Sequence, residues 1–94
     1  MKLIIAIIQD KFVNEAVKNF TEENIKITKL ASTGGFLKSG NSTFLIGVED
    51  DELDFVKNII KKSVKDEEFK SEDGNIIVSG AHLFIVDVDK TIAL

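Results

Sequence analysis

Apolar residues recur along this chain in patterns that predict four strands. Residues 2–9 contain the unbroken run LIIAII, which is typical of a central strand covered on both faces. Over residues 25–30, Ile25, Ile27 and Leu30 alternate with polar residues, which indicates a half-buried strand. Segments 43–48 (TFLIGV) and 81–88 (AHLFIVDV) predict two further strands, and Gly47 marks either a bulge or a place where something approaches the backbone.

Two other segments carry apolar residues at helical spacing. The first follows Asp10, which we expect to cap the helix, and it ends at Asn24. The second opens on the acidic residues 50–52, and lysines crowd its end, so that both clusters complement the helix dipole. The predicted core-facing residues are Val13, Ala16, Val17 and Phe20 in the first helix and Leu53, Val56, Ile60 and Val64 in the second.

The segment between the second helix and the last strand predicts a hairpin. Residues 66–74 are strongly polar, and Asp73-Gly74 stands between Phe69 and the apolar residues 76–78. The predicted order is strand, helix, strand, strand, helix, strand, with one extra short strand before the last. Two helices on one face of a four-stranded antiparallel sheet form a ferredoxin-like βαββαβ sandwich of the α+β class.

One face of this predicted sheet is left without helices. The run LIIAII requires cover on both faces, whereas two helices cover only one face of a sheet. Because exposed apolar sheet faces usually mark interfaces, we expect a homotrimer in which the sheets face inward.

Composition restricts the class of protein. The 94 residues, 44% hydrophobic and 30% charged, predict one globular domain over residues 1–94. The chain has no cysteine, which excludes disulfides and thiolate zinc sites, and its net charge of −4 argues against a broad nucleic-acid surface. The longest apolar run, residues 3–8, is too short to span a membrane and lacks a signal-peptide cleavage site, so we expect a cytoplasmic protein.

Residues 32–49 are the stretch best suited to a ligand. Closely spaced glycines surround Phe36, Leu37 and Lys38. Backbone amides suit phosphate, a phenyl ring suits stacking on a base, and an ammonium suits negative charge, so the set predicts a nucleotide site. A hairpin whose Phe36 and Leu37 fold back into the core is the alternative interpretation of the same residues.

The chain shows no residue set typical of an enzyme. Catalysis requires an acid, base or nucleophile with a positioned partner, and the single histidine, His82, lies in a predicted strand beside apolar residues. Asp50 and Asp51 complement a helix start, while Asp87 and Asp89 have no third metal ligand nearby in sequence. We therefore expect a binding protein with no catalytic residues, cofactor or metal.

The glycine-rich segment resembles that of the PII-like cyclic di-AMP receptors. The pattern TGGFL-x-x-GN-x-TFL-x-GV over residues 33–48 carries the resemblance, and residues 1–10 are similar to theirs as well. The similarity runs without a gap to Ile60 and resumes weakly over residues 80–89. It implies a PII-like signal-transduction protein: a homotrimer of ferredoxin-like subunits, with one cyclic di-AMP in each cleft between subunits and a downstream protein partner.

The resemblance also implies which residues bind the ligand. They comprise polar groups near the second strand, a loop that closes on an adenine, an amide that hydrogen-bonds the base region, and a glycine on the cleft wall. Lys26 stands where the family has arginine, which keeps the charge but loses the bidentate fork for phosphate. The polar groups near the second strand belong to Asn24 and Thr28, with Lys26 between them, and the loop residues are Gly35, Phe36 and Leu37. The amide is that of Asn41, and the glycine on the cleft wall is Gly47.

Two regions depart from the family pattern. The family carries a long Gly/Pro-rich loop between the second helix and the last strand, whereas this chain has a short acidic stretch without proline. The family's C-terminal tail reaches the ligand with an amide side chain, and Ala93 stands at the matching place here. Two alternatives therefore stay open: a PII-like trimer that binds another adenine nucleotide, ATP or ADP, and one that has lost its ligand.

Overall fold

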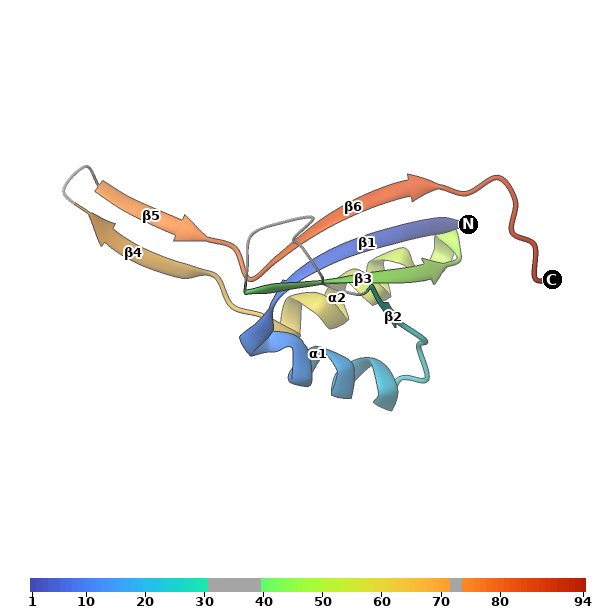
Figure 1. The fold of residues 1–94 in the computed structure, drawn as a ribbon, viewed down its shortest axis with the longest axis horizontal. Coiled ribbons are helices and arrows are strands. Elements are labelled where there is room, and N and C mark those ends of the chain that lie inside the picture. Colours follow the sequence, from blue (N-terminus) through green and yellow to red (C-terminus); the bar gives the residue numbers. More distant parts are fainter. Residues whose placement is uncertain (31–39, 72–73) are drawn as a thin grey trace.

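The computed structural model describes residues 1–30, 40–71 and 74–94 (Figure 1). The main body is a four-stranded antiparallel sheet with the strand order β2-β3-β1-β6. The two helices, α1 and α2, both lie on one face of this sheet (Figure 1). The elements of the body are β1 (Lys2–Gln9), α1 (Asp10–Glu22), β2 (Thr28–Lys29), β3 (Asn41–Val48), the 3₁₀ turn η1 (Asp50–Glu52), α2 (Leu53–Ser63) and β6 (Ala81–Asp87).

This order of strands and helices is compatible with the ferredoxin-like fold, and the predicted α+β class with a four-stranded antiparallel sheet is confirmed. The central strand β1 has the predicted bounds. The edge strand β2 is much shorter than predicted, because only two of its residues pair with β3. Ile25 and Ile27 nevertheless pack against the core, as their alternation with polar residues indicated.

An additional hairpin stands between α2 and β6. Its strands, β4 (Glu67–Ser71) and β5 (Gly74–Val78), pair antiparallel as a separate two-stranded sheet. Figure 1 shows this hairpin projecting from the body at the end of the sheet where β6 begins. The predicted hairpin is confirmed, but the expectation of a single extra strand is wrong, because the polar residues before the turn form a strand as well.

The core lies between the sheet and the two helices. Because side chains alternate along a strand, one set of residues on β1 and β3 faces the helices. Removing apolar surface from water, at about 25 cal/mol per Å², is the main force that holds these layers together. The buried cluster consists of Ile4, Ala6, Ile8, Phe44, Ile46 and Val48 from the strands and Ala16, Phe20, Val56, Ile59 and Ile60 from the helices.

The core-facing side of α1 differs from the prediction at one position. Val17, predicted in the core, is 38% exposed, because the buried stripe of the helix runs through Asn19 and Phe20. Asn19 Nδ2 donates a hydrogen bond to Ser63 Oγ at 2.8 Å, and the Ser63 hydroxyl donates to the carbonyl oxygen of Ile59 at 2.6 Å. A satisfied polar pair therefore joins the two helices where the pattern predicted only apolar contacts.

The start of α1 also differs from the prediction. Asp10 is the first residue of the helix, and Gln9 occupies the N-cap position, so the expectation that Asp10 caps the helix is wrong. The Asp10 carboxylate instead accepts a hydrogen bond from Ser42 Oγ at 2.6 Å. Its charge still complements the helix dipole, and the hydrogen bond fastens the helix start to β3.

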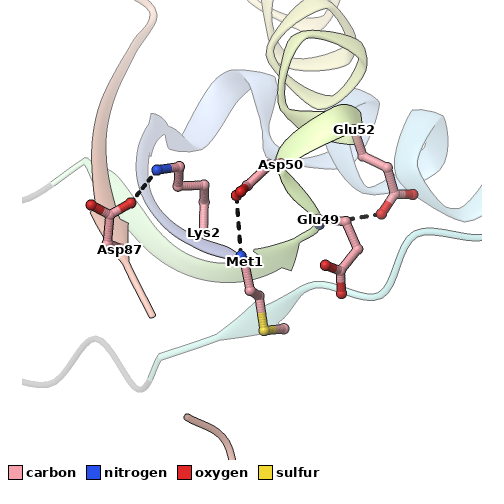
Figure 2. A network of polar contacts seen from close by, with 6 residues as sticks. All are labelled: Met1, Lys2, Glu49, Asp50, Glu52 and Asp87. Carbon is pink, nitrogen blue, oxygen red and sulfur yellow. Dashed lines mark hydrogen bonds and ion pairs between the residues drawn. The ribbon is translucent and has the colours of Figure 1, made fainter. Parts of the chain in front are cut away.

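The acidic residues expected to open the second helix form η1, a separate 3₁₀ turn in front of α2. Figure 2 shows the polar contacts around this turn. The amino nitrogen of Met1 lies 3.1 Å from Asp50 Oδ1, and the Glu49 N–H donates to Glu52 Oε1 at 3.3 Å. One contact thus stabilises the turn internally, and the other joins it to the residue that precedes β1.

Candidate functional site

The face of the sheet opposite the helices carries three of the residues predicted to bind the ligand: Thr28, Asn41 and Gly47. We call it the open face. We assign residues to the open face from the strand pairing and from the alternation of side chains along each strand, which puts the intervening residues on the core side. They are Leu3, Ile5, Ile7 and Gln9 on β1, Asn41, Thr43, Leu45 and Gly47 on β3, His82, Phe84 and Val86 on β6, and Thr28 on β2.

Apolar side chains occupy the middle of the open face. Strand pairing aligns Thr28, Leu45, Ile5 and Phe84 in one row across all four strands. Phe84 is 55% exposed and Val86, two residues further along β6, is 48% exposed, although both are large and apolar. A contiguous exposed surface of this kind marks an interaction site.

The open face is polar at the end where the hairpin leaves the body. Asn41 begins β3 and pairs with Gln9, the last residue of β1. Gln9 Nε2 donates a hydrogen bond to the carbonyl oxygen of Ser79 at 2.9 Å, and the Gln9 backbone N–H donates to the carbonyl oxygen of Gly80 at 3.1 Å. The start of β3 and the chain that leaves the hairpin therefore lie on either side of Gln9.

Gly47 lies near the other end of β3, about 20 Å along the strand from Asn41. It pairs with Leu3 in an uninterrupted register, so of the two interpretations of this glycine the bulge is wrong. A Cβ at Gly47 would lie 3.4 Å from Met1 Cε, an ordinary contact, so the fold itself does not require glycine here. The exposed backbone is open to the close approach of another molecule.

Thr28 and Lys26 line the outer rim of the sheet. Both are exposed, and Thr28 belongs to the edge strand β2. Because β2 and β3 are antiparallel, the chain before Thr28 runs toward the Gly47 end of β3, which places Lys26 at that end. Ile25 and Ile27 pack against the core, so the alternate residues face away from it. A hydroxyl and an ammonium therefore stand along one rim.

Asn24 has a backbone role as well as the predicted binding role. It adopts a positive φ of 58° just after α1, and its N–H donates to the carbonyl oxygen of Thr21 at 3.1 Å. The Ile25 N–H donates to the carbonyl oxygen of Phe20 at 3.0 Å, and the Ile25 side chain packs against the core cluster that contains Phe20. These features form a Schellman motif, in which only Gly and Asn are common at the left-handed position.

Gly35, Phe36 and Leu37 lie outside the described residues. The described chain stops at Leu30, whose N–H donates to the carbonyl oxygen of Thr43 at 2.9 Å, and resumes at residue 40. In sequence, the segment that contains them stands between β2 and β3. Their predicted contact with an adenine stays a prediction, as does the alternative in which they enter the core.

One ion pair joins the central strand to β6. Lys2 Nζ contacts Asp87 Oδ1 on the neighbouring strand (Figure 2). The hydrogen bond from Lys2 and, second, its charge lower the pKa of Asp87, while the hydrogen bond and charge of Asp87 raise the pKa of Lys2. Lys2 and Asp87 alternate with the open-face residues Leu3 and Val86, so the pair lies on the helix side of the sheet, and none of the residues predicted to bind the ligand takes part in it.

The described residues offer little for metal or acid–base chemistry. No group of three or more His, Asp or Glu side chains within residues 1–30, 40–71 and 74–94 could hold a metal ion. His82 is exposed on the open face and pairs with Ile7 through the backbone, and its imidazole makes no hydrogen bond with another described residue. None of the helices in the described part of the chain is long and apolar enough to cross a membrane.

A groove of about 650 Å³ that the sequence pattern did not indicate lies between α2 and the first half of β6, on the helix side of the sheet. Ile60 and Leu83 contribute apolar surface to it, and Lys57, Lys61 and Asp54 contribute charges of both signs. It arises from elements far apart in sequence, so no local motif marks it. The described residues predicted to bind the ligand do not line this groove.

Comparison with known proteins adds two findings. Residues 1–72 match the sequence model of a family described as cyclic-di-AMP receptor, and this span contains every residue predicted to bind the ligand. The chain is also similar to a protein of unknown function from Pediococcus pentosaceus, whose crystal structure is known. The two proteins share 40% sequence identity and a TM-score of 0.75, and the alignment covers 99% of this chain and 96% of that one.

Proposed function

The chain belongs to the cyclic-di-AMP receptor family, and from this premise we propose that it is a PII-like signal-transduction protein that binds cyclic di-AMP between the subunits of a homotrimer and catalyses no reaction. The observation that carries the proposal is the family match over residues 1–72. That span holds the glycine-rich segment and the whole of β1, β2 and β3, which supply the rim and all of the open face except the residues of β6.

The apolar surface of the open face supports the trimeric part of the proposal. A single subunit leaves Phe84, Val86 and Met1 each more than two-fifths exposed on or beside this face. Packing the open faces of several copies together removes this surface from water, at a gain of about 25 cal/mol per Å². In such an assembly the rim formed by Lys26 and Thr28 borders the neighbouring subunit, where a shared ligand cleft would lie.

The arrangement of the polar residues supports a ligand with two bases. Asn41 and Gly47 stand about 20 Å apart along β3, and a dinucleotide reaches further along this strip than a mononucleotide does. On the rim, Thr28 offers a hydroxyl opposite Leu45, and Lys26 offers a positive charge for phosphate at the Gly47 end. In this proposal Phe36 stacks on an adenine, an interaction that is worth roughly 1–3 kcal/mol.

The departures from the family pattern favour two competing functions. The family match ends at residue 72, so β5, β6 and Ala93 lie outside it. A tail without the expected amide suits a trimer that binds ATP or ADP in the same cleft, or one whose cleft no longer binds a ligand. The downstream protein partner belongs to the same part of the proposal. The resemblance implies that the family signals to its partner through the Gly/Pro-rich loop, and the hairpin of β4 and β5 stands in its place here.

Thermal unfolding in the presence of cyclic di-AMP, cyclic di-GMP, ATP and ADP tests these functions against one another. A ligand at 100 times its Kd stabilises the folded protein by about 2.7 kcal/mol per site. The proposal requires the largest shift with cyclic di-AMP. A shift with ATP or ADP alone favours the mononucleotide trimer, and no shift with any nucleotide favours the lost site. A Phe36→Ala variant that unfolds, rather than binding more weakly, supports the core interpretation of Phe36.

A further inference from the structure

Gln9 is the one amide side chain of β1, and it stands at the polar end of the open face beside Asn41. We propose that the Gln9 amide reads an adenine of the bound ligand, with Oε1 accepting from the N6 amino group and an N–H donating to N7. This inference rests on the proposed function, because it concerns the same cleft. It identifies a specificity-determining residue outside the glycine-rich segment.

The orientation of the amide supports this role. Gln9 Nε2 lies 2.9 Å from the carbonyl oxygen of Ser79, and a carbonyl oxygen can only accept a hydrogen bond. The amino group of Gln9 must therefore face Ser79, which prevents the amide from flipping. One N–H is used in this way, and Oε1 accepts no hydrogen bond from another described residue.

The remaining edge of the amide matches adenine. A Gln or Asn side chain that offers one acceptor and one donor forms a bidentate pair with N6 and N7 of adenine. Guanine carries acceptors at both O6 and N7, so the fixed Oε1 of Gln9 would face O6 without a proton between them. The bond to Ser79 therefore turns an amide that could serve either base into one that selects adenine.

The position of Gln9 places it within reach of the predicted base. Gln9 and Asn41 are direct partners in the antiparallel pair of β1 and β3, so their Cβ atoms lie about 4.5–5.5 Å apart. Both side chains are partly exposed and project from the open face. A base held by Asn41 is thus a neighbour of the Gln9 amide.

A cycle of two proteins and two ligands tests the proposal by calorimetric titration. The proteins are the wild type and Gln9→Leu, and the ligands are cyclic di-AMP and an analogue whose purines lack the N6 amino group. In the wild type we expect the analogue to bind about tenfold more weakly. In Gln9→Leu we expect this penalty to shrink by about three- to tenfold, because the same interaction is already absent.

An undiminished penalty in Gln9→Leu overturns the role of Gln9 while leaving the proposed function intact. Failure of the wild type to bind cyclic di-AMP overturns the proposed function instead. Asn58→Leu removes an exposed amide of α2 on the helix side and is the matched control, for which both affinities should stay unchanged.

A second measurement needs no variant, which matters if Gln9→Leu does not fold. The chain contains a single glutamine, so selective ¹⁵N labelling of the glutamine amide reports on Gln9 alone. We expect its side-chain amide resonances to move on saturation with cyclic di-AMP and to move less with the analogue. Resonances that stay in place at saturation with cyclic di-AMP contradict the proposal.

Discussion

The backbone of Gly80 lies against the backbone of Lys65 with no room for a side chain between them. A Cβ at Gly80 would stand 2.6 Å from the carbonyl oxygen of Lys65 and 2.8 Å from the Cβ of Val64. The Gly80 N–H donates to Asp66 Oδ1 at 3.2 Å, and its carbonyl oxygen accepts from the Gln9 N–H at 3.1 Å. This contact holds the end of α2, the base of the hairpin and the start of β6 together.

Gly80→Ala should therefore destabilise the protein by about 1–3 kcal/mol, because the added methyl group meets backbone atoms that cannot rotate away. Urea denaturation measures the change. Gly47→Ala is the matched control, since its Cβ would meet only the flexible end of Met1 at 3.4 Å. Equal free energies of unfolding for the two variants would contradict the close packing of Gly80.

Two substitutions of Asn24 should separate its backbone role from its binding role. Asn24→Gly adopts the positive φ of 58° without strain. Asn24→Ala keeps a Cβ in the left-handed region without the short polar side chain that makes Asn tolerable there, at a cost of about 1–2 kcal/mol relative to the glycine variant. Both variants lack the amide, so both should lose affinity for cyclic di-AMP to the same extent, while only the alanine variant loses stability. Full affinity in Asn24→Gly would show that the amide does not touch the ligand.

A charge on the open face should prevent the subunits from associating. Phe84→Glu places a carboxylate at the β6 end of the apolar row, where burial without a partner is strongly unfavourable. Phe55→Glu is the control, because Phe55 is 48% exposed on α2, an element on the other side of the sheet. Sedimentation velocity should find Phe84→Glu monomeric, and Phe55→Glu trimeric like the wild type. A wild type that is itself monomeric at micromolar concentration would overturn the trimer.

The ion pair between Lys2 and Asp87 should make stability depend on pH on the acid side. Lys2 lowers the folded-state pKa of Asp87 from its ordinary value of 3.8. The pair therefore contributes stability above pH 3.8 and loses this contribution as the pH falls through the lower folded-state pKa. Asp87→Asn should flatten this part of the curve of unfolding free energy against pH, and the exposed Asp89→Asn should not. Both partners are solvated, so the change is small, and equal slopes in all three proteins would contradict the pair.

The elements with a strong local pattern were predictable from the sequence. The run LIIAII indicated β1 because a strand buried on both sides needs apolar residues throughout. The length of the edge strand β2 could not be predicted. The alternation of apolar and polar residues shows which side chains are buried, but it does not show which backbone groups form hydrogen bonds with the neighbouring strand. Asp10 was misplaced for a similar reason: its partner is Ser42, which is distant in sequence and reaches it only through the pairing of β1 with β3.

The candidate site also contains residues that the local sequence indicated and a residue that only the fold reveals. The glycine-rich motif indicated Asn41 and Gly47, and the fold puts both on the open face. No motif indicated Gln9, because its importance comes from Ser79, which follows β5 at the base of the hairpin, and from its strand partner Asn41. Contacts between segments far apart in sequence decide such positions, and only the fold brings those segments together.

Calorimetric titration of the wild-type protein with cyclic di-AMP, alongside cyclic di-GMP, tests the central claim most directly. We expect one molecule of cyclic di-AMP to bind per subunit, as one cleft for each pair of neighbours in a trimer requires. Cyclic di-GMP should bind at least about tenfold more weakly, because an acceptor at O6 would meet an acceptor of the protein and leave both unpaired. Equal affinities for the two ligands, or no heat of binding with cyclic di-AMP, would contradict the account.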